Sequence, residues 1–464
     1  MDISKLLNPI RNKRPRFDES AVEVDKLWLP TELIAYIMQF IYFRIRSRFR
    51  LVSKSWYTAY ELYHRNLIFD NLVHVNRPKV TRKQTLDAFR KYGHRLRFLD
   101  VDTNFLRYML EYEPNFAELI PNVTSTYIGI RDGLPSELWV GNVLAKLTKL
   151  NRISIAEYGY DADENLAAEL DKAIGNMPHF RQFAASDMDL DIAVLTGENM
   201  RLIGGKLTVL DVSIPNMAAG MVAPTLGVFK NVAILWLKLI SSIEVLHKVT
   251  EVVTNPKSFP LLSELSVMTQ VDITRTAPII DEQTGERITG YGLFKKICSI
   301  RRPRFDLSVG FGLGACSTTD AALIETERNF IINLAKNHND VLVGLEITHF
   351  TPVGDYDPIT TFLYESVPRF ERLAFMRFYA SPTASTSPKL IAALNNSFLL
   401  PYLAFVDVIV DGGQAPEWNS GSNPLDTSRG VMVSTTLEDN DDKLRAENES
   451  NNGILASRFL PDDV

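Results

Sequence analysis

Cysteine, histidine and serine, which often act as metal ligands or nucleophiles, show no reactive arrangement in this sequence. The two cysteines, Cys298 and Cys316, and the seven histidines do not stand at the spacing of a zinc site. No Gly-x-Ser-x-Gly motif, which places a nucleophilic serine on a sharp turn, occurs. We therefore expect no metal, no cofactor and no catalytic residue, and a protein that is not an enzyme.

One glycine-rich stretch, Gly310-Phe311-Gly312-Leu313-Gly314, invites comparison with phosphate-binding loops. It lacks the lysine and the serine or threonine that end a P-loop, and it misses the spacing of the dinucleotide-binding fingerprint. We interpret it as a tight turn after a strand around Phe305 and Leu307.

The composition is that of a globular protein, with 45% hydrophobic and 23% charged residues among 464. Lys and Arg number 50 against 56 Asp and Glu, so the net charge of −6 gives no electrostatic reason to bind nucleic acid. Few cysteines suit a reducing compartment. The start has no secretion signal, and no apolar run is long enough to cross a bilayer. We expect a cytoplasmic or nuclear protein with neither a membrane nor a nucleic-acid partner.

A short pattern, apolar-x-x-apolar-x-apolar, recurs along the middle of the chain. Its central positions are 99, 128, 153, 183, 210, 235, 265, 305, 345, 373 and 406, of which the copies at 128 and 305 are weaker because they lack the first apolar residue. Most intervals between them are 25 to 30 residues, and two are 40. Leucine-rich repeats have periods of about 20–29 residues, so this spacing lies at or just beyond their long end.

The segments between these positions carry helix signals. Asn165–Met177 and Ser242–Val253 hold apolar residues at steps of three or four, and Pro178 closes the first. Strands that alternate with helices at a short period predict parallel strands and right-handed crossovers. The expected fold class is α/β: an irregular leucine-rich-repeat solenoid of about 11 strands, shaped as a horseshoe. The alternative is an ordinary α/β domain whose buried strands share the pattern.

Composition divides the chain into five parts. We expect a disordered basic tail at 1–26, a helical module at 27–67, a linker with one helix at 68–94, the solenoid at 95–411 with an insertion near 270–303, and a flexible polar tail at 412–464.

The most specific motif lies within the helical module. It begins Leu29-Pro30-Thr31-Glu32-Leu33 and ends Leu51-Val52-Ser53-Lys54-Ser55-Trp56. Pro30 suits the first turn of a helix, and Leu33, Ile37 and Phe40 form an apolar stripe. Two helices of about 10 residues are not stable alone. We therefore expect another polypeptide to cover them.

This segment resembles an F-box, which usually opens Leu-Pro-x-Glu and closes with Val, a small residue, Lys or Arg, and Trp. Its middle departs from the family, because Arg44, Arg46, Ser47 and Arg48 occupy a stretch where leucines are usual. With the repeats behind it, the chain is similar to the F-box leucine-rich-repeat proteins, the substrate receptors of Skp–cullin–F-box ubiquitin ligases. The resemblance implies that the F-box docks on a Skp-family adaptor and through it on cullin, while the repeats hold a protein substrate.

The match to the family motif also implies which residues dock on the adaptor. They are Leu29, Pro30, Leu33, Ile37, Phe40, Val52 and Trp56. The alternative is that Leu33, Ile37, Val52 and Trp56 are mainly the module's own core. A second reading of the whole chain is a repeat scaffold outside any ligase, in which these helices only cap the solenoid.

A substrate would bind the concave side of the solenoid, where side chains between and after the buried points face outward. The candidates are Asp211, Trp236, Lys238, Glu346 and Met376. Trp236 is the foremost, because tryptophan is over-represented among binding hot spots; alternatively, it fills a gap in a distorted repeat. No pattern identifies the substrate.

Overall fold

The computed structural model describes residues 30–31, 33–34, 52–59, 82–130, 134–157, 165–186, 191–274, 276–280, 285–313, 320–350, 372–380, 405–410 and 432–437. The chain divides into two compact units. We call Asp2–Gln182 with Gly197–Met200 the amino-terminal unit, and Phe183–Thr196 with Arg201–Val464 the carboxy-terminal unit.

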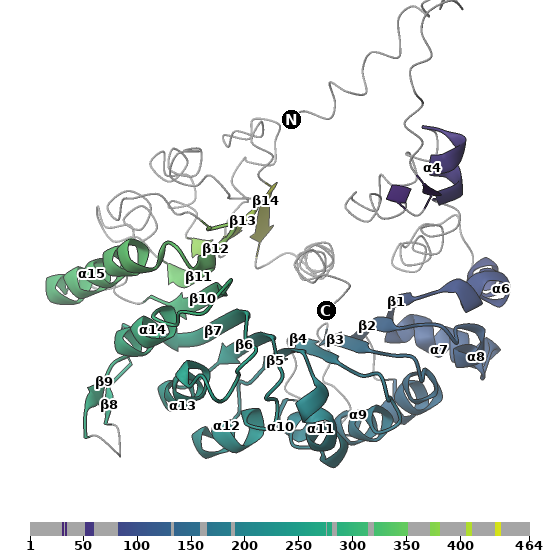
Figure 1. Ribbon diagram of the computed structural model, residues 1–464, viewed down its shortest axis with the longest axis horizontal. Coiled ribbons are helices and arrows are strands. Elements are labelled where there is room, and N and C mark those ends of the chain that lie inside the picture. The colour runs from purple at the N-terminus through teal and green to yellow at the C-terminus, as the bar shows by residue number, and fades with distance from the viewer. Residues whose placement is uncertain are drawn as a thin grey trace, which may run out of the picture. The chain divides into compact units, whose positions relative to one another are not determined.

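The carboxy-terminal unit is built on one sheet whose strands follow each other in chain order (Figure 1). The strands are β4 (Gln182–Ser186), β5 (Val209–Ser213), β6 (Ile234–Ile240), β7 (Glu264–Asp272), β10 (Asp306–Gly312), β11 (Leu342–Phe350), β12 (Phe375–Ala380), β13 (Phe405–Val410) and β14 (Met432–Leu437). From β5 onward, neighbouring strands pair in parallel.

Alternating side chains give the sheet one apolar face. Leu210, Leu235, Leu265 and Leu307 hold equivalent positions on neighbouring strands, and each is completely buried. Because successive residues of a strand point to opposite faces, every second residue joins this layer. The predicted central positions from 210 to 406 all lie in, or within two residues of, these strands. The predicted α/β class with parallel strands is therefore confirmed.

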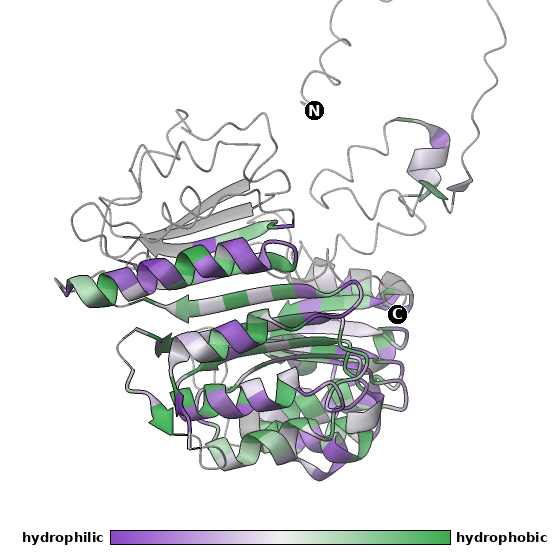
Figure 2. Ribbon diagram, turned by 60° about the vertical axis from the view of Figure 1, so that its left-hand side comes forward, coloured by the Kyte–Doolittle hydropathy of each residue, from purple (hydrophilic) through white to green (hydrophobic). Residues whose placement is uncertain are grey.

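Helices cover the apolar face in Figure 1, and those that follow each other in the chain pack together. They are α10 (Asp191–Leu195), α11 (Glu198–Ile203), α12 (Ala219–Leu226), α13 (Ile243–Thr254), α14 (Gly290–Cys298) and α15 (Ala321–His338), with the short turn η7 (Gly204–Lys206). Their hydrophobic and hydrophilic residues form separate bands in Figure 2. None of the helices in the described residues is long and apolar enough for a membrane span.

Helix α13 shows how the sequence determines such a helix. The Ser242 side chain accepts a hydrogen bond from the Val245 backbone amide at 3.2 Å, which caps the helix. The apolar stripe that includes Leu246, Val249 and Val253 is buried against the sheet. The helix is thus stabilised mainly by packing of one face.

The amino-terminal unit repeats the same order of elements. It contains α4 (Lys54–Ala59), α6 (Arg82–Tyr92), η4 (Gly93–Arg95), β1 (Phe98–Asp102), α7 (Thr103–Tyr112), α8 (Phe116–Leu119), β2 (Ser125–Ile130), η5 (Glu137–Gly141), η6 (Leu144–Lys146), β3 (Arg152–Glu157) and α9 (Leu166–Ile174). Strands β1, β2 and β3 pair in parallel. The rings of Phe89, Phe105 and Phe116 pack together, which ties α6 to α7 and α8.

The predicted insertion at 270–303 is narrower than expected. It begins within β7, and α14 packs between α13 and α15 as a regular helix of the layer. The departure from the strand–helix order is the hairpin of β8 (Ile279–Ile280) and β9 (Arg287–Ile288), which pair antiparallel. The charged and polar residues around α14 made this segment resemble an insertion. Its apolar residues Leu293, Phe294 and Ile297 are nevertheless completely buried.

The predicted flexible tail at 412–464 contains a further strand, β14, which pairs in parallel with β13. Its sequence Met432-Val433-Ser434-Thr435-Thr436-Leu437 is rich in residues that favour strands. The prediction of a flexible tail rests on the average composition of residues 412–464. Six strand-forming residues within it hardly change that average. The expectation was therefore wrong for this segment.

The glycine-rich stretch is also different from the expected turn. Gly310 and Gly312 lie inside β10. A side chain at Gly310 would collide with the Met268 side chain from β7 and would press against Glu346 from β11. Glycine is needed here because the neighbouring strands' side chains cover this position, so no phosphate-binding loop forms.

Candidate functional site

Three of the predicted substrate-binding residues lie together on the polar face of the sheet, opposite the apolar layer. Asp211 on β5 is directly beside Trp236 on β6, and Lys238 follows two residues later on the same face. Glu264 at the start of β7 completes the group through Trp236. We call Asp211, Trp236, Lys238 and Glu264 the Trp236 patch.

A charged pair forms one side of the Trp236 patch. The Lys238 ammonium lies 2.9 Å from one carboxylate oxygen of Asp211 and donates a hydrogen bond to the other at 3.0 Å. The same ammonium lies 5.5 Å from the centre of the Trp236 ring, within cation–π range. Asp211 is only 8% exposed, so this ion pair is shielded from water. These contacts fix the orientation of the indole ring.

Glu264 forms the other side, and the sequence analysis did not single it out. The Trp236 indole N–H donates a hydrogen bond to Glu264 Oε1 at 2.7 Å. Burial raises the pKa of the Glu264 carboxyl to about 7, against the lowering effect of the indole hydrogen bond, with smaller raising contributions from Asp306 and Asp211. Glu264 therefore changes charge near neutral pH.

The position of Glu264 explains its electrostatic environment. It stands directly opposite Asp306 on β10, and like charges in such cross-strand pairs repel. Asp306 is neutralised by Arg372, which also donates to the Phe305 carbonyl at 2.7 Å. Within the described residues, Glu264 has no basic partner. Only the strand register brings Trp236 and Glu264 together, and the sequence alone does not give that register.

Glu346 extends the polar face toward the next strands. It pairs with Arg377 on β12 at 3.5 Å, and the guanidinium of Arg377 lies 5.6 Å from the centre of the Phe375 ring. The pair repeats the arrangement of Lys238, Asp211 and Trp236: an acid, a base and an aromatic ring on adjacent strands. Glu346 and Arg377 are both less than a quarter exposed, so each charge is largely neutralised by the other.

Met376 does not belong to this face, contrary to the prediction. It is 1% exposed and stands opposite Leu345, which is in the buried layer. The repeat pattern fits this strand twice, as Phe370/Leu373/Phe375 and as Leu373/Met376/Phe378. The pairing of β12 with β11 agrees with the second pattern, Leu373/Met376/Phe378. The two patterns differ by three positions, and a shift by an odd number of residues moves every side chain to the opposite face of the sheet.

The predicted adaptor-docking residues fall only partly within the described residues. Pro30 is exposed, Leu33 is 43% exposed and Val52 is 62% exposed, whereas Trp56 is half-buried. Leu29, Ile37 and Phe40 lie outside the described residues. A helical turn begins at Pro30, whose carbonyl accepts from the Ile34 amide at 3.0 Å. Ile34 is the buried residue of this turn, so Leu33 and Ile34 face different environments.

Tyr57 adds to this surface, although the motif did not point to it. It lies in α4 directly after Trp56 and is 50% exposed. Leu33, Val52 and Tyr57 are thus exposed apolar or aromatic side chains in the described parts of the helical module. We call these three residues the exposed apolar set.

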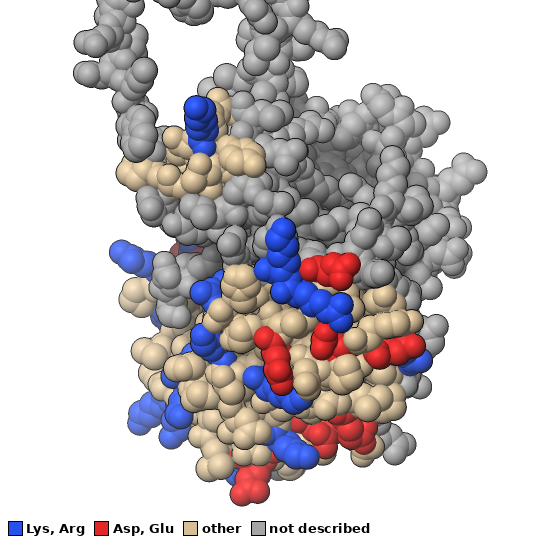
Figure 3. All heavy atoms as spheres, turned by 90° about the vertical axis from the view of Figure 1, so that its right-hand side faces the viewer, with Lys and Arg blue, Asp and Glu red and all other residues tan. Residues whose placement is uncertain are grey.

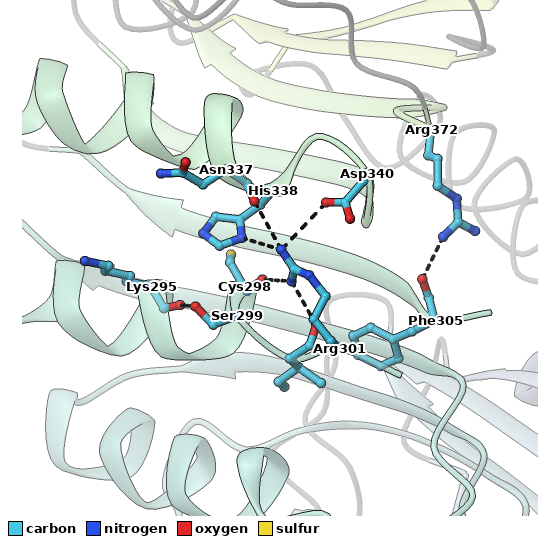
Figure 4. Close-up of polar contacts among 10 residues, drawn as sticks. Lys295, Cys298, Ser299, Arg301, Phe305, Asn337, His338, Asp340 and Arg372 are labelled. Atoms are coloured by element: carbon cyan, nitrogen blue, oxygen red, sulfur yellow. Dashed lines mark hydrogen bonds and ion pairs between the residues drawn. The ribbon is translucent and has the colours of Figure 1, made fainter. Parts of the chain in front are cut away.

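A second polar cluster joins the carboxyl ends of α14 and α15 (Figure 4). The Arg301 guanidinium donates to the carbonyls of Cys298 at 2.7 Å, Ile300 at 3.0 Å and Asn337 at 3.1 Å. It also lies 3.2 Å from His338 Nδ1 and 3.7 Å from the Asp340 carboxylate. We call this arrangement the Arg301 clamp. It satisfies helix-end carbonyls that would otherwise lack donors.

The chemically reactive groups of the Arg301 clamp are held in their unreactive forms. Burial raises the pKa of the Cys298 thiol to about 12, so the thiolate does not form at neutral pH. Burial, together with the Arg301 charge, lowers the pKa of His338. Among the described residues, no group of three potential ligands could hold a metal ion.

No family model and no curated protein matches this sequence. Among solved structures, the chain is similar to the crystal structure of the Rad7 and Elc1 complex in yeast, with 13% sequence identity and a TM-score of 0.37. The match covers 83% of this chain and 93% of that chain.

Proposed function

We propose that this protein is the substrate-recognition subunit of a Skp–cullin–F-box ubiquitin ligase. In this proposal residues 27–67 form an F-box that docks on a Skp-family adaptor and through it on cullin. The strand–helix repeats form a leucine-rich-repeat solenoid that holds the target protein. The protein would act in the cytoplasm or the nucleus, without a cofactor.

The observation that carries the proposal is an F-box-like motif whose apolar side chains are exposed. Leu33 and Val52 occupy motif positions and are 43% and 62% exposed. Exposed apolar side chains at motif positions are candidates for a surface that another polypeptide covers. Leu33 and Val52 are thus available to an adaptor rather than committed to a core.

The receptor function needs binding and no bond chemistry. The Trp236 patch offers an aromatic ring and both signs of charge on an ordered sheet, a combination typical of protein-recognition sites. Tethering a substrate beside a ubiquitin-charged enzyme raises its effective concentration to about the millimolar range. The buried, protonated thiol of Cys298 agrees with a role that uses no nucleophile of its own at that position.

The test is capture of a Skp-family adaptor by the full chain. Leu33→Asp and Val52→Asp should each weaken capture at least tenfold, because a charge at a covered apolar position is left without a partner. Leu202→Asp is the matched control, since Leu202 is 74% exposed on α11 and lies outside the motif. Equal capture by all three variants, or none by the unaltered chain, would contradict the proposal.

The second candidate is a leucine-rich-repeat scaffold outside any ligase. The ordered polar face with its Trp236 patch supports it equally, because protein binding does not require an adaptor. Deletion of residues 27–67 separates the two: a ligase receptor loses the adaptor and keeps its repeat-bound partner. A scaffold whose helices only cap the solenoid never captures the adaptor and loses stability on deletion.

A further inference from the structure

Four successive segments of the carboxy-terminal unit that lead into β5, β6, β7 and β10 carry basic residues and no acidic ones, whereas the segment between α15 and β11 contains Asp340. The four segments are 204–208, 227–233, 255–263 and 299–305, with the sequences GGKLT, GVFKNVA, NPKSFPLLS and SIRRPRF. The protein as a whole has more acidic than basic residues. One-sided charge in four consecutive segments is therefore a local property.

Backbone and side-chain contacts place these four segments next to each other. The Ala233 amide donates to the Thr208 carbonyl at 2.8 Å, and the Ser263 amide donates to the Ala233 carbonyl at 2.8 Å. The Asp306 amide continues the series by donating to the Ser263 carbonyl at 2.9 Å. Arg302 also donates to the Phe259 carbonyl. The segments thus form one continuous edge at the amino ends of β5, β6, β7 and β10.

Four basic side chains on this edge are exposed and form no hydrogen bond or ion pair with any described residue. They are Lys206, Lys230, Lys257 and Arg304. We call them the basic edge. Arg301 and Arg302 differ from them, because both bind backbone carbonyls.

The helix dipole does not account for all of the basic edge. Positive charges are favoured near a helix carboxyl end, but the effect is confined to the last turn. Lys230 lies four residues beyond the end of α12 at Leu226, and Arg304 lies six beyond the end of α14 at Cys298. Interactions with the preceding helices therefore do not explain Lys230 and Arg304, whereas Lys206 lies in the last turn of η7.

Arg304 also has an unfavourable backbone conformation. Its φ of 53° lies in the left-handed region, which glycine and asparagine adopt more readily than arginine. Its side chain forms no hydrogen bond or ion pair with the described residues that would compensate for this conformation. Strain held without a structural benefit indicates a functional role for the side chain.

We propose that the basic edge binds an extended acidic segment of a partner protein. Parallel strands are about 4.8 Å apart, so the edge from β5 to β10 is about 14 Å long, a distance that an extended segment of about five residues spans. In the amino-terminal unit the segments 93–97 and 147–151 contain basic and no acidic residues, whereas 120–124 contains neither. Figure 3 shows Lys and Arg both at the left margin of the described surface and at its centre, where they lie beside Asp and Glu.

A polypeptide is favoured over a single-stranded nucleic acid because the edge has no exposed aromatic surface for bases to stack on. Single-stranded nucleic acids are held by aromatic stacking as well as by charge. The aromatic residues of these four segments, Phe229, Phe259 and Phe305, are all at most 2% exposed. The edge thus offers its charges together with the apolar side chain of Leu261, which is 58% exposed.

The test measures binding of a fluorescent oligoglutamate to the full chain by anisotropy, at low and at physiological salt. Neutralising the edge with Lys206→Gln, Lys230→Gln, Lys257→Gln and Arg304→Gln should weaken binding about tenfold and reduce its salt dependence. Lys248→Gln is the control, because Lys248 lies on α13 outside the edge. The affinity of this variant for oligoglutamate should be within about twofold of that of the unaltered chain.

A single substitution separates binding from stability. Arg304→Gly removes one charge and relieves the left-handed backbone, so it should weaken oligoglutamate binding while leaving the melting temperature unchanged or higher. Unaltered binding in both edge variants, or tighter binding of a single-stranded oligonucleotide of equal charge, would overturn the proposal. Absence of oligoglutamate binding by the unaltered chain would overturn it as well, whatever the adaptor experiment shows.

Discussion

The Trp236 patch and the Arg301 clamp contain similar residues but play different parts. Each joins a cation to acceptors from neighbouring elements, and each holds a group whose pKa is shifted. In the clamp the acceptors are the last carbonyls of two helices, so the cluster satisfies the fold itself. In the patch the partners are side chains that project from a sheet face. A shifted pKa therefore identifies a binding site only where the group faces outward.

The substitution with the largest expected effect tests whether the Arg301 clamp stabilises the fold. Arg301→Ala removes the donor to the carbonyls of Cys298, Ile300 and Asn337. It should lower the free energy of unfolding by about 2–3 kcal/mol, because several acceptors lose their partner at once. Urea unfolding followed by circular dichroism measures it. Arg301→Lys should recover less than half, since an ammonium cannot span both helix ends. A loss below about 0.5 kcal/mol would show that the clamp is not structural.

Lys238→Met tests whether the patch also stabilises the fold. The substitution keeps the aliphatic chain but leaves the buried Asp211 carboxylate without its ammonium partner. We expect the free energy of unfolding at pH 7 to fall by about 1–2 kcal/mol. The matched control is Lys248→Met on α13, which breaks the exposed pair with Glu251 and should change it by under about 0.5 kcal/mol. Equal effects of the two variants would contradict a shielded pair.

The pH dependence of Glu264→Gln sharpens the comparison further. The folded-state pKa of Glu264 is about 7, above the ordinary 4.5, so the folded protein binds this proton more tightly than the unfolded chain. Its ionisation therefore destabilises the fold progressively as the pH rises from about 4.5 to about 7. Glu264→Gln should raise the free energy of unfolding by about 1 kcal/mol at pH 8 and change it little at pH 4. Urea unfolding at the two pH values measures both quantities. An equal effect at both would contradict the raised pKa.

The smallest expected effect concerns the indole hydrogen bond alone. Trp236→Phe keeps a ring beside Lys238 but removes the N–H that donates to Glu264 at 2.7 Å. Because this bond favours the carboxylate, the pKa of Glu264 should rise further above about 7. A carboxyl-carbon NMR titration of Glu264 gives the direct measurement. An unchanged or lower pKa would mean that the indole does not stabilise the charge.

The sequence predicted the strand–helix order because buried parallel strands must carry apolar residues at fixed positions. It could not resolve which of two matching patterns forms β12, so Met376 was placed on the wrong face. Average composition also concealed β14 within a polar tail. Local sequence patterns therefore predict which helices and strands form. They do not predict the register, because the register depends on how each strand pairs with its neighbours.

The candidate site was predictable only in part for the same reason. Asp211, Trp236 and Lys238 follow from counting outward-facing positions along a strand. Glu264 lies 28 residues from Trp236 in the sequence, and only the pairing of β6 with β7 brings the two side chains together. The Arg301 clamp likewise depends on two helix ends that are 36 residues apart.

The glycines at positions 310 and 344 limit how this protein can diversify. A methyl group at Gly310 would collide with Met268, and one at Gly344 would collide with Ser308. Mutational drift can therefore alter the outward-facing residues on either side of these glycines more easily than the glycines themselves. Homologous chains should therefore retain Gly310 and Gly344 and vary more at the residues around them.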